Sequence, residues 1–249
     1  NGSHFITLFG DSVNLLSSSK EDNSGETDLA REKNGNSKTI PETPVNSLDR
    51  PCRDIAIIGM HGRFSKASNL DQFWNNILNK SDLMEEIPAD HWDFTPWFDE
   101  DQTVPDRTYN KWGSFISDVD KFDSQFFKIS PREAAWMDPQ GRLFLESIYS
   151  AAEDSGYVNH IRKTNTGVFV GVCFDDYKDK ISELNQPADP YVGTGNAKTL
   201  LANRVSFIFD LMGPSIAIDT ACSSSLFALH QACIALRNNE CDMAFVGGV

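Results

Sequence analysis

The segment around Cys222 constrains the fold of this chain more than any other, because it joins a strand to a helix through a few small residues. Before it, the alternating isoleucines of 214–218 predict a strand. After it, apolar residues recur at helical spacing, at Leu226, Leu229, Cys233 and Leu236. Cys222 is therefore expected on a tight turn, where unpaired N–H groups and the helix dipole favour a thiolate. The Cys222 N–H is also suited to stabilise an oxyanion there.

The alternative for any free cysteine is a small buried apolar side chain. Thr220-Ala221 and Ser223-Ser224-Ser225 pack poorly in a core, so Cys222 is the candidate nucleophile. The other cysteines keep the ordinary interpretation, at Cys52, Cys173, Cys233 and Cys241. No pair has C-x-x-C spacing, so no metal site is expected. The odd number of cysteines and the absence of a secretory signal favour the reducing cytoplasm.

Composition excludes several classes of function. The formal net charge of −14 argues against nonspecific nucleic-acid binding. No apolar run approaches the roughly 20 residues that span a membrane. Residues 17–49 are so polar that we expect a linker, and 5–9 are interpreted as the end of an upstream folded unit. The expected organisation is thus an upstream end and linker at 1–53 and one domain at 54–249, within a larger polypeptide.

Strands and helices alternate along the second part. An apolar run predicts a buried strand at 54–59, a second run predicts a strand at 166–172, and 242–246 is expected to open another strand. Ser130-Pro131 and Asp138-Pro139 are helix-start signals, and the second helix is expected to stop near Gly156. Further helices are predicted at 70–78 and 197–209, and a long ordered loop at 87–112. This alternation indicates an α/β fold with a largely buried sheet.

The quoted residues also resemble a known family. Asp219–Leu226 (DTACSSSL) is similar to the active-site signature of the β-ketoacyl synthase (ketosynthase) domains of modular polyketide synthases. Further blocks agree in the same order, at Ile55–Met60, Phe122–Ala134, Met137–Gln140, Arg142-Leu143, Ala202–Arg204 and Gly213–Ser215. The resemblance covers 54–249.

The resemblance implies a thiolase-like, layered αβαβα fold in a homodimer, with only the first of two similar halves present. It implies that Cys222 accepts an acyl chain from the phosphopantetheine of an acyl carrier protein, with no cofactor bound by the chain itself. A malonyl-carrier thioester would then lose CO₂ and attack the acyl-cysteine to give a β-ketoacyl thioester. The family's two catalytic histidine motifs belong to its second half, so the 249-residue piece is expected to be inactive alone.

No histidine in this chain has the neighbours of those motifs. His230 follows Cys222 by roughly 12 Å along a helix, beyond the reach of a general base. His61 is assigned to a surface turn, and no P-loop pattern surrounds Lys198. Two alternatives remain open: a non-condensing ketosynthase that transfers acyl chains or acts as a dimeric scaffold, and a cysteine hydrolase, which would need a histidine base elsewhere.

Overall fold

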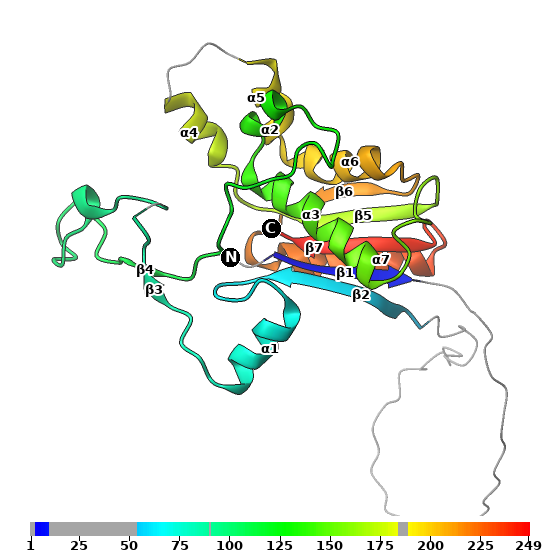
Figure 1. Cartoon of the computed structure of the whole chain (residues 1–249), viewed down its shortest axis with the longest axis horizontal. Coiled ribbons are helices and arrows are strands. Elements are labelled where there is room, and N and C mark those ends of the chain that lie inside the picture. Colours follow the sequence, from blue (N-terminus) through cyan, green and yellow to red (C-terminus); the bar gives the residue numbers. More distant parts are fainter. Residues whose placement is uncertain (1–2, 10–53, 90, 184–188) are drawn as a thin grey trace, which may run out of the picture. The chain divides into compact units, whose positions relative to one another are not determined.

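The central element of the fold is a five-stranded sheet with the order β2-β1-β7-β5-β6 (Figure 1). The computed structural model describes residues 3–9, 54–89, 91–183 and 189–249, and only the backbone of 3–9. The strands of the sheet are β1 (Ser3–Phe9), β2 (Ala56–Arg63), β5 (Thr166–Gly171), β6 (Ser215–Ile218) and β7 (Met243–Gly248). β5 runs parallel to both β6 and β7, whereas β1 is antiparallel to β2 and β7.

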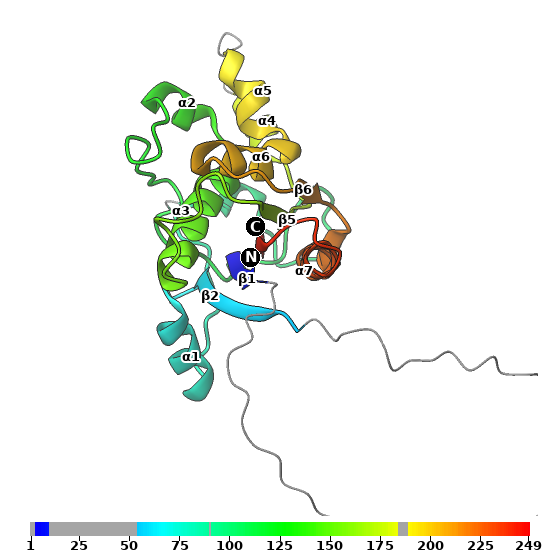
Figure 2. The same ribbon diagram turned by 90° about the vertical axis from the view of Figure 1, so that its right-hand side faces the viewer.

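Helices cover both faces of this sheet. α3 (Pro139–Asp154) and α6 (Lys198–Phe209) lie on one face, and α7 (Ser224–Arg237) lies on the other, as Figure 2 shows with the sheet seen nearly end-on. The shorter elements are α1 (Leu70–Leu78), α2 (Pro131–Trp136), α4 (Tyr177–Glu183), α5 (Pro190–Asn196), the 3₁₀ turns η1 (Thr95–Trp97) and η2 (Ala221–Ser223), and the small ladder of β3 (Glu85–Glu86) with β4 (Trp112–Gly113). None of the described helices has the length and apolar composition needed to cross a bilayer.

The side chains of β5 enter two separate parts of the core, because successive side chains of a strand point to opposite faces of the sheet. Val168 and Val170 pack into the cluster under α3 and α6, together with Phe144. Phe169 packs into the cluster under α7, where Ala228 and other alanines let the helix approach closely. Every residue of β5 is buried. The predictions of an α/β fold and of a strand at 166–172 are confirmed.

Two helix starts predicted from the sequence are confirmed by their caps. The Ser130 hydroxyl accepts the N–H of Glu133 at 3.1 Å, and the Asp138 carboxylate accepts the N–H of Gln140 at 2.9 Å. These bonds satisfy donors that have no partner inside the helix. α3 ends just before Gly156, whose φ of +75° suits a residue without a Cβ. Among its described residues, the loop predicted at 87–112 contains only η1 and the start of β4.

Three expectations differ from the structure. Residues 5–9 do not end a separate unit, because the backbone of β1 pairs with both β2 and β7. β2 is an edge strand, and Ile57 is 55% exposed, so the strand expected at 54–59 is not buried. His61 lies half-buried within β2 and not on a surface turn. All three depend on which strands become neighbours, and strand pairing is not encoded in local periodicity. The linker expected within 10–53 lies outside the described residues, and the boundary after residue 53 stays a prediction.

Candidate active site

Cys222 lies in η2, the single 3₁₀ turn that connects β6 to α7. The strand-to-helix turn predicted around it is therefore confirmed. The preceding residue, Ala221, has a φ of +53°, in the left-handed region that costs a residue with a Cβ about 1 kcal/mol or more. Such a conformation persists only where neighbouring contacts hold it, so the contacts of this turn determine where the thiol sits.

Serine and threonine hydroxyls supply several of those contacts. The buried Ser224 hydroxyl accepts the N–H of Thr220 at 2.9 Å and donates to the carbonyl of Ala221 at 2.7 Å. The Ser223 hydroxyl donates to the Thr220 carbonyl at 2.8 Å. The sequence alone indicates only that these serines are small and pack poorly in a core. Their structural role is to cross-link the turn that carries Cys222.

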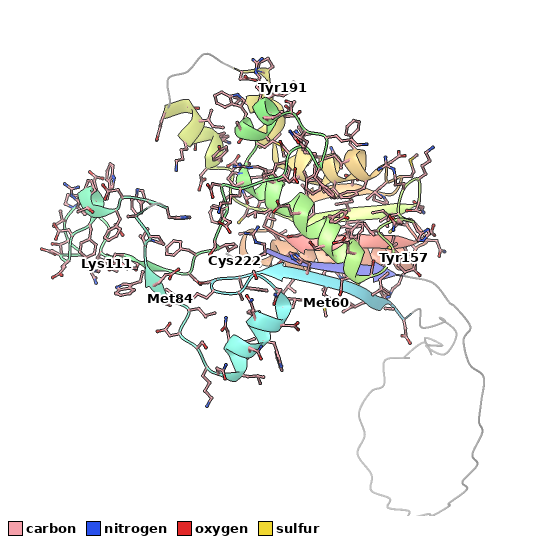
Figure 3. All side chains as sticks on the ribbon, in the orientation of Figure 1. Met60, Met84, Lys111, Tyr157, Tyr191 and Cys222 are labelled. Atoms are coloured by element: carbon pink, nitrogen blue, oxygen red, sulfur yellow. The ribbon has the colours of Figure 1, made fainter. Side chains whose placement is uncertain are left out.

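The Cys222 side chain is exposed and faces a pocket of about 600 Å³. The pocket lies where the carboxyl ends of β5, β6 and β7 meet the start of α7, and Figure 3 labels Cys222 at this end of the sheet. Gly171, Phe174 and Ser225 are among its lining residues. The thiol is thus accessible and has space beside it for an elongated substituent.

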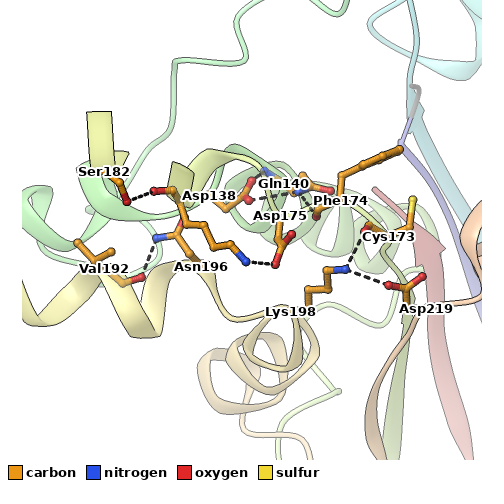
Figure 4. A network of polar contacts seen from close by, with 11 residues as sticks. Asp138, Gln140, Cys173, Phe174, Asp175, Ser182, Val192, Asn196, Lys198 and Asp219 are labelled. Atoms are coloured by element: carbon orange, nitrogen blue, oxygen red, sulfur yellow. Dashed lines mark hydrogen bonds and ion pairs between the residues drawn. The ribbon is translucent and has the colours of Figure 1, made fainter. Parts of the chain in front are cut away.

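An ion pair borders the same pocket. The Lys198 ammonium donates to the Asp219 carboxylate at 2.9 Å and to the carbonyl of Cys173 at 2.6 Å (Figure 4). The hydrogen bond from Lys198, followed by that from the N–H of Ala221, holds the pKa of Asp219 below its usual value. The hydrogen bond to Asp219 in turn raises the pKa of Lys198. Both groups are therefore charged at neutral pH. The sequence does not predict this ion pair, because no local motif links Lys198 to Asp219.

The other described cysteines differ from Cys222 in their surroundings. Cys241 is buried, and loss of solvation raises its pKa to about 11. Cys233 is half-buried on α7 and packs against the core cluster beneath that helix, as expected. Cys173 follows β5 and is half-buried at the edge of the pocket. All are free thiols, and Cys52 lies outside the described residues.

Histidine bases do not complete a catalytic pair with Cys222 in the described part of the chain. His230, which the sequence placed on the helix beyond the reach of a general base, is exposed on α7 and lies beside the ring of Phe227, at 6.0 Å between centroids. No described histidine lines the pocket at Cys222. The described side chains also contain no group of three or more His, Cys, Asp or Glu residues placed to hold a metal ion.

Comparison with known proteins identifies the family. The model of the β-ketoacyl synthase N-terminal domain matches residues 52–249. The chain belongs to the β-ketoacyl synthase family. Among curated relatives of this synthase chain, polyketide synthase PksL of Bacillus subtilis is 43% identical over 246 residues, covering 90% of the chain and 5% of PksL. Polyketide synthase ThaG of Burkholderia thailandensis is 47% identical over 196 residues, covering 78% of the chain and 4% of ThaG.

Solved ketosynthase structures share the fold of this synthase chain. The oxazolomycin ketosynthase domain OzmH KS7 of Streptomyces albus superposes with a TM-score of 0.69 at 41% identity, over 77% of this chain and 33% of that one. The ketosynthase from module 6 of the bacillaene synthase of Bacillus subtilis gives 0.69 at 37% identity, over 78% and 32%. The predicted thiolase-like α/β fold is confirmed, and the chain spans about a third of these ketosynthases.

Proposed function

We propose that Cys222 is the acyl-accepting nucleophile of a condensing acyltransferase in polyketide biosynthesis. The observation that supports this most directly is the exposed free thiol on a strained turn at the start of α7, beside a pocket of about 600 Å³. A thiolate at a helix start is favoured by the helix dipole. It is also both a good nucleophile and a good leaving group, which acyl transfer in two directions requires.

In the proposed reaction, the Cys222 sulfur attacks the thioester carbonyl of an acyl chain carried on the phosphopantetheine of an acyl carrier protein. The carrier's thiol leaves with a proton, and the acyl group becomes a cysteine thioester. A malonyl thioester on a second carrier protein then loses CO₂. The resulting enolate carbon attacks the acyl-cysteine, and the Cys222 thiolate leaves. The partners in this reaction are carrier-protein domains. A second copy of the synthase is expected from the family resemblance, and the odd number of cysteines favours a reducing compartment such as the cytoplasm.

Loading with an acyl-thioester probe tests the nucleophile. The Cys222→Ala variant should lose the acyl mass increment completely, because no other described thiol is equally exposed. Cys233→Ala is the matched control, because it removes a half-buried thiol from the same helix and should load normally. Undiminished loading of Cys222→Ala would show that another group accepts the acyl chain.

A second measurement separates condensation from simple acyl transfer. The full protein that carries this chain is loaded and then supplied with a malonyl-carrier thioester. A β-ketoacyl product is expected from the condensing enzyme. Loading without product, together with intact acyl transfer to a second carrier protein, would instead assign the non-condensing alternative.

A further inference from the structure

Lys198 occupies a position that helix stability does not explain. It is the first residue of α6, and the N-cap residue Ala197 makes no side-chain capping bond. A cation at a helix N-terminus opposes the helix dipole and is normally unfavourable there. A lysine at this position therefore needs compensation from outside its own helix, and its contacts show where that compensation comes from.

The contacts of Lys198 connect two strand ends that line the Cys222 pocket. Its ammonium donates to the carbonyl of Cys173, which follows β5, and to one carboxylate oxygen of Asp219, which follows β6 (Figure 4). The other carboxylate oxygen of Asp219 accepts the N–H of Ala221 at 3.1 Å. Ala221 is the left-handed residue that precedes Cys222. A continuous series of polar contacts thus leads from Lys198 to the turn that carries the thiol.

We propose that Lys198 is a positioning residue for the Cys222 nucleophile. It holds the Asp219 carboxylate in the orientation that fixes the left-handed turn, and it neutralises a negative charge three residues before the thiol. A bare carboxylate at that position would disfavour a thiolate and slow its reactions. The catalytic meaning of this role rests on the proposed function, but its effect on the Cys222 thiol can be measured without any acyl substrate.

The other charged and titratable groups around Lys198 support this assignment. Asp175 also lies within electrostatic reach of Lys198, as does the Cys173 thiol. Asp175 has a second cation, because it forms an ion pair with Lys178. Asp219 pairs with Lys198 and with the N–H of Ala221. Removal of Lys198 therefore leaves a negative charge without a cation mainly at Asp219, next to the turn that carries Cys222.

The test is alkylation of Cys222 by iodoacetamide in the full chain, followed by site-resolved mass spectrometry from about pH 6 to 10. Lys198→Met should slow alkylation at neutral pH about three- to tenfold and move the midpoint of the pH profile upward, as expected for one unit charge near the thiol. Lys198→Arg should restore the rate to within about twofold, because it keeps the charge. In an Asp219→Asn background, Lys198→Met should slow alkylation less than in the unaltered chain, because only the direct effect of the lysine charge on the thiol remains.

Two controls make the result specific. Lys178→Met removes a lysine that pairs with Asp175 and not with a residue lining this pocket, so the Cys222 profile should not change. Cys241, with its pKa raised to about 11 by burial, reports global opening if it becomes reactive in any variant. A role confined to folding would lower the melting temperature and leave the midpoint of the Cys222 profile unchanged, and that result would overturn the proposal. Additive effects of Lys198→Met and Asp219→Asn would overturn it as well.

The experiment remains decisive if Lys198→Met does not fold. Asp219→Asn keeps an acceptor for the N–H of Ala221 and removes the charge, whereas Asp219→Ala removes both. Because both variants leave the same charge on Lys198, alkylation of Cys222 should be slower in the second than in the first, and equal rates would refute the positioning role. If Lys198 alters alkylation while Cys222 takes no acyl group, only the proposed function fails. If Cys222 takes the acyl group normally and substitution of Lys198 does not change its alkylation, only the proposed positioning role fails.

Discussion

Gly171, the last residue of β5, allows α7 to approach the sheet closely enough to place Cys222 in its pocket. A Cβ at this position would lie 2.4 Å from the backbone nitrogen of Ser225 and 2.5 Å from the carbonyl carbon of Ser224. Ordinary contact begins at 3.4 Å, so the first turn of α7 would have to move by about 1 Å. The obstructing atoms are backbone and cannot rotate away.

The Gly171→Ala variant is therefore expected to lose stability and reactivity together. Overpacking of this kind costs about 1–3 kcal/mol, which corresponds to a decrease in melting temperature of about 2–12 °C for a domain of this size. A displacement of about 1 Å at a nucleophile can reduce the rate of reaction by about 100-fold. The assays are thermal unfolding followed by circular dichroism and the rate of acyl loading at Cys222.

Gly193→Ala is the matched control for this substitution. Gly193 lies in α5, and a Cβ there would meet nothing within 4 Å. Alanine is the better helix former, so this variant should be as stable as the unaltered chain or more stable by up to about 1 kcal/mol. If Gly171→Ala and Gly193→Ala melt at the same temperature and load at the same rate, the close approach of α7 does not hold the active-site turn.

Two further predictions concern stability. Asp138→Ala should lower the free energy of unfolding by about 1 kcal/mol in urea titrations, because the N-cap of α3 is lost; Asp138→Asn, which keeps an acceptor and removes a carboxylate whose pKa burial raises, should cost less. Burial lowers the pKa of His61 from its ordinary 6.5, so the unfolded chain binds that proton more readily and stability falls as the pH decreases below about 6.5. His61→Gln should reduce the loss of melting temperature between about pH 7.5 and 5.5, and an unchanged loss would exclude His61 as a contributor.

Local chemistry made several elements predictable. Ser130-Pro131 and Asp138-Pro139 predict helix starts, because the side chain of the first residue caps backbone N–H groups of the first turn and the proline suits the first helical position. The same signal at Asp189-Pro190 marks the start of α5, which was not predicted although the Asp189 carboxylate accepts the N–H of Tyr191 at 2.9 Å. This helix is short, contains glycine and has no apolar residues at helical spacing, so hydrophobic periodicity does not predict it.

The candidate site also has one part that the local sequence predicts and one part that it does not. The strand, turn and helix around Cys222 follow from residues adjacent in the chain, so the sequence was sufficient to predict an accessible thiol on a strand-to-helix turn. The contact between Lys198 and Asp219 depends on folding, because residues far apart in the chain meet only after β5 and β6 align their carboxyl ends.

By itself, the sequence determined the alternation of strands and helices, the helix caps and the turn that carries Cys222, since each depends on interactions between residues close together in the chain. The tertiary structure alone decided that β2 is an exposed edge strand, that β1 lies between β2 and β7, and that Lys198 reaches Asp219 beside the Cys222 turn. These features depend on backbone pairing and charge contacts between distant segments, which no local pattern of residues specifies.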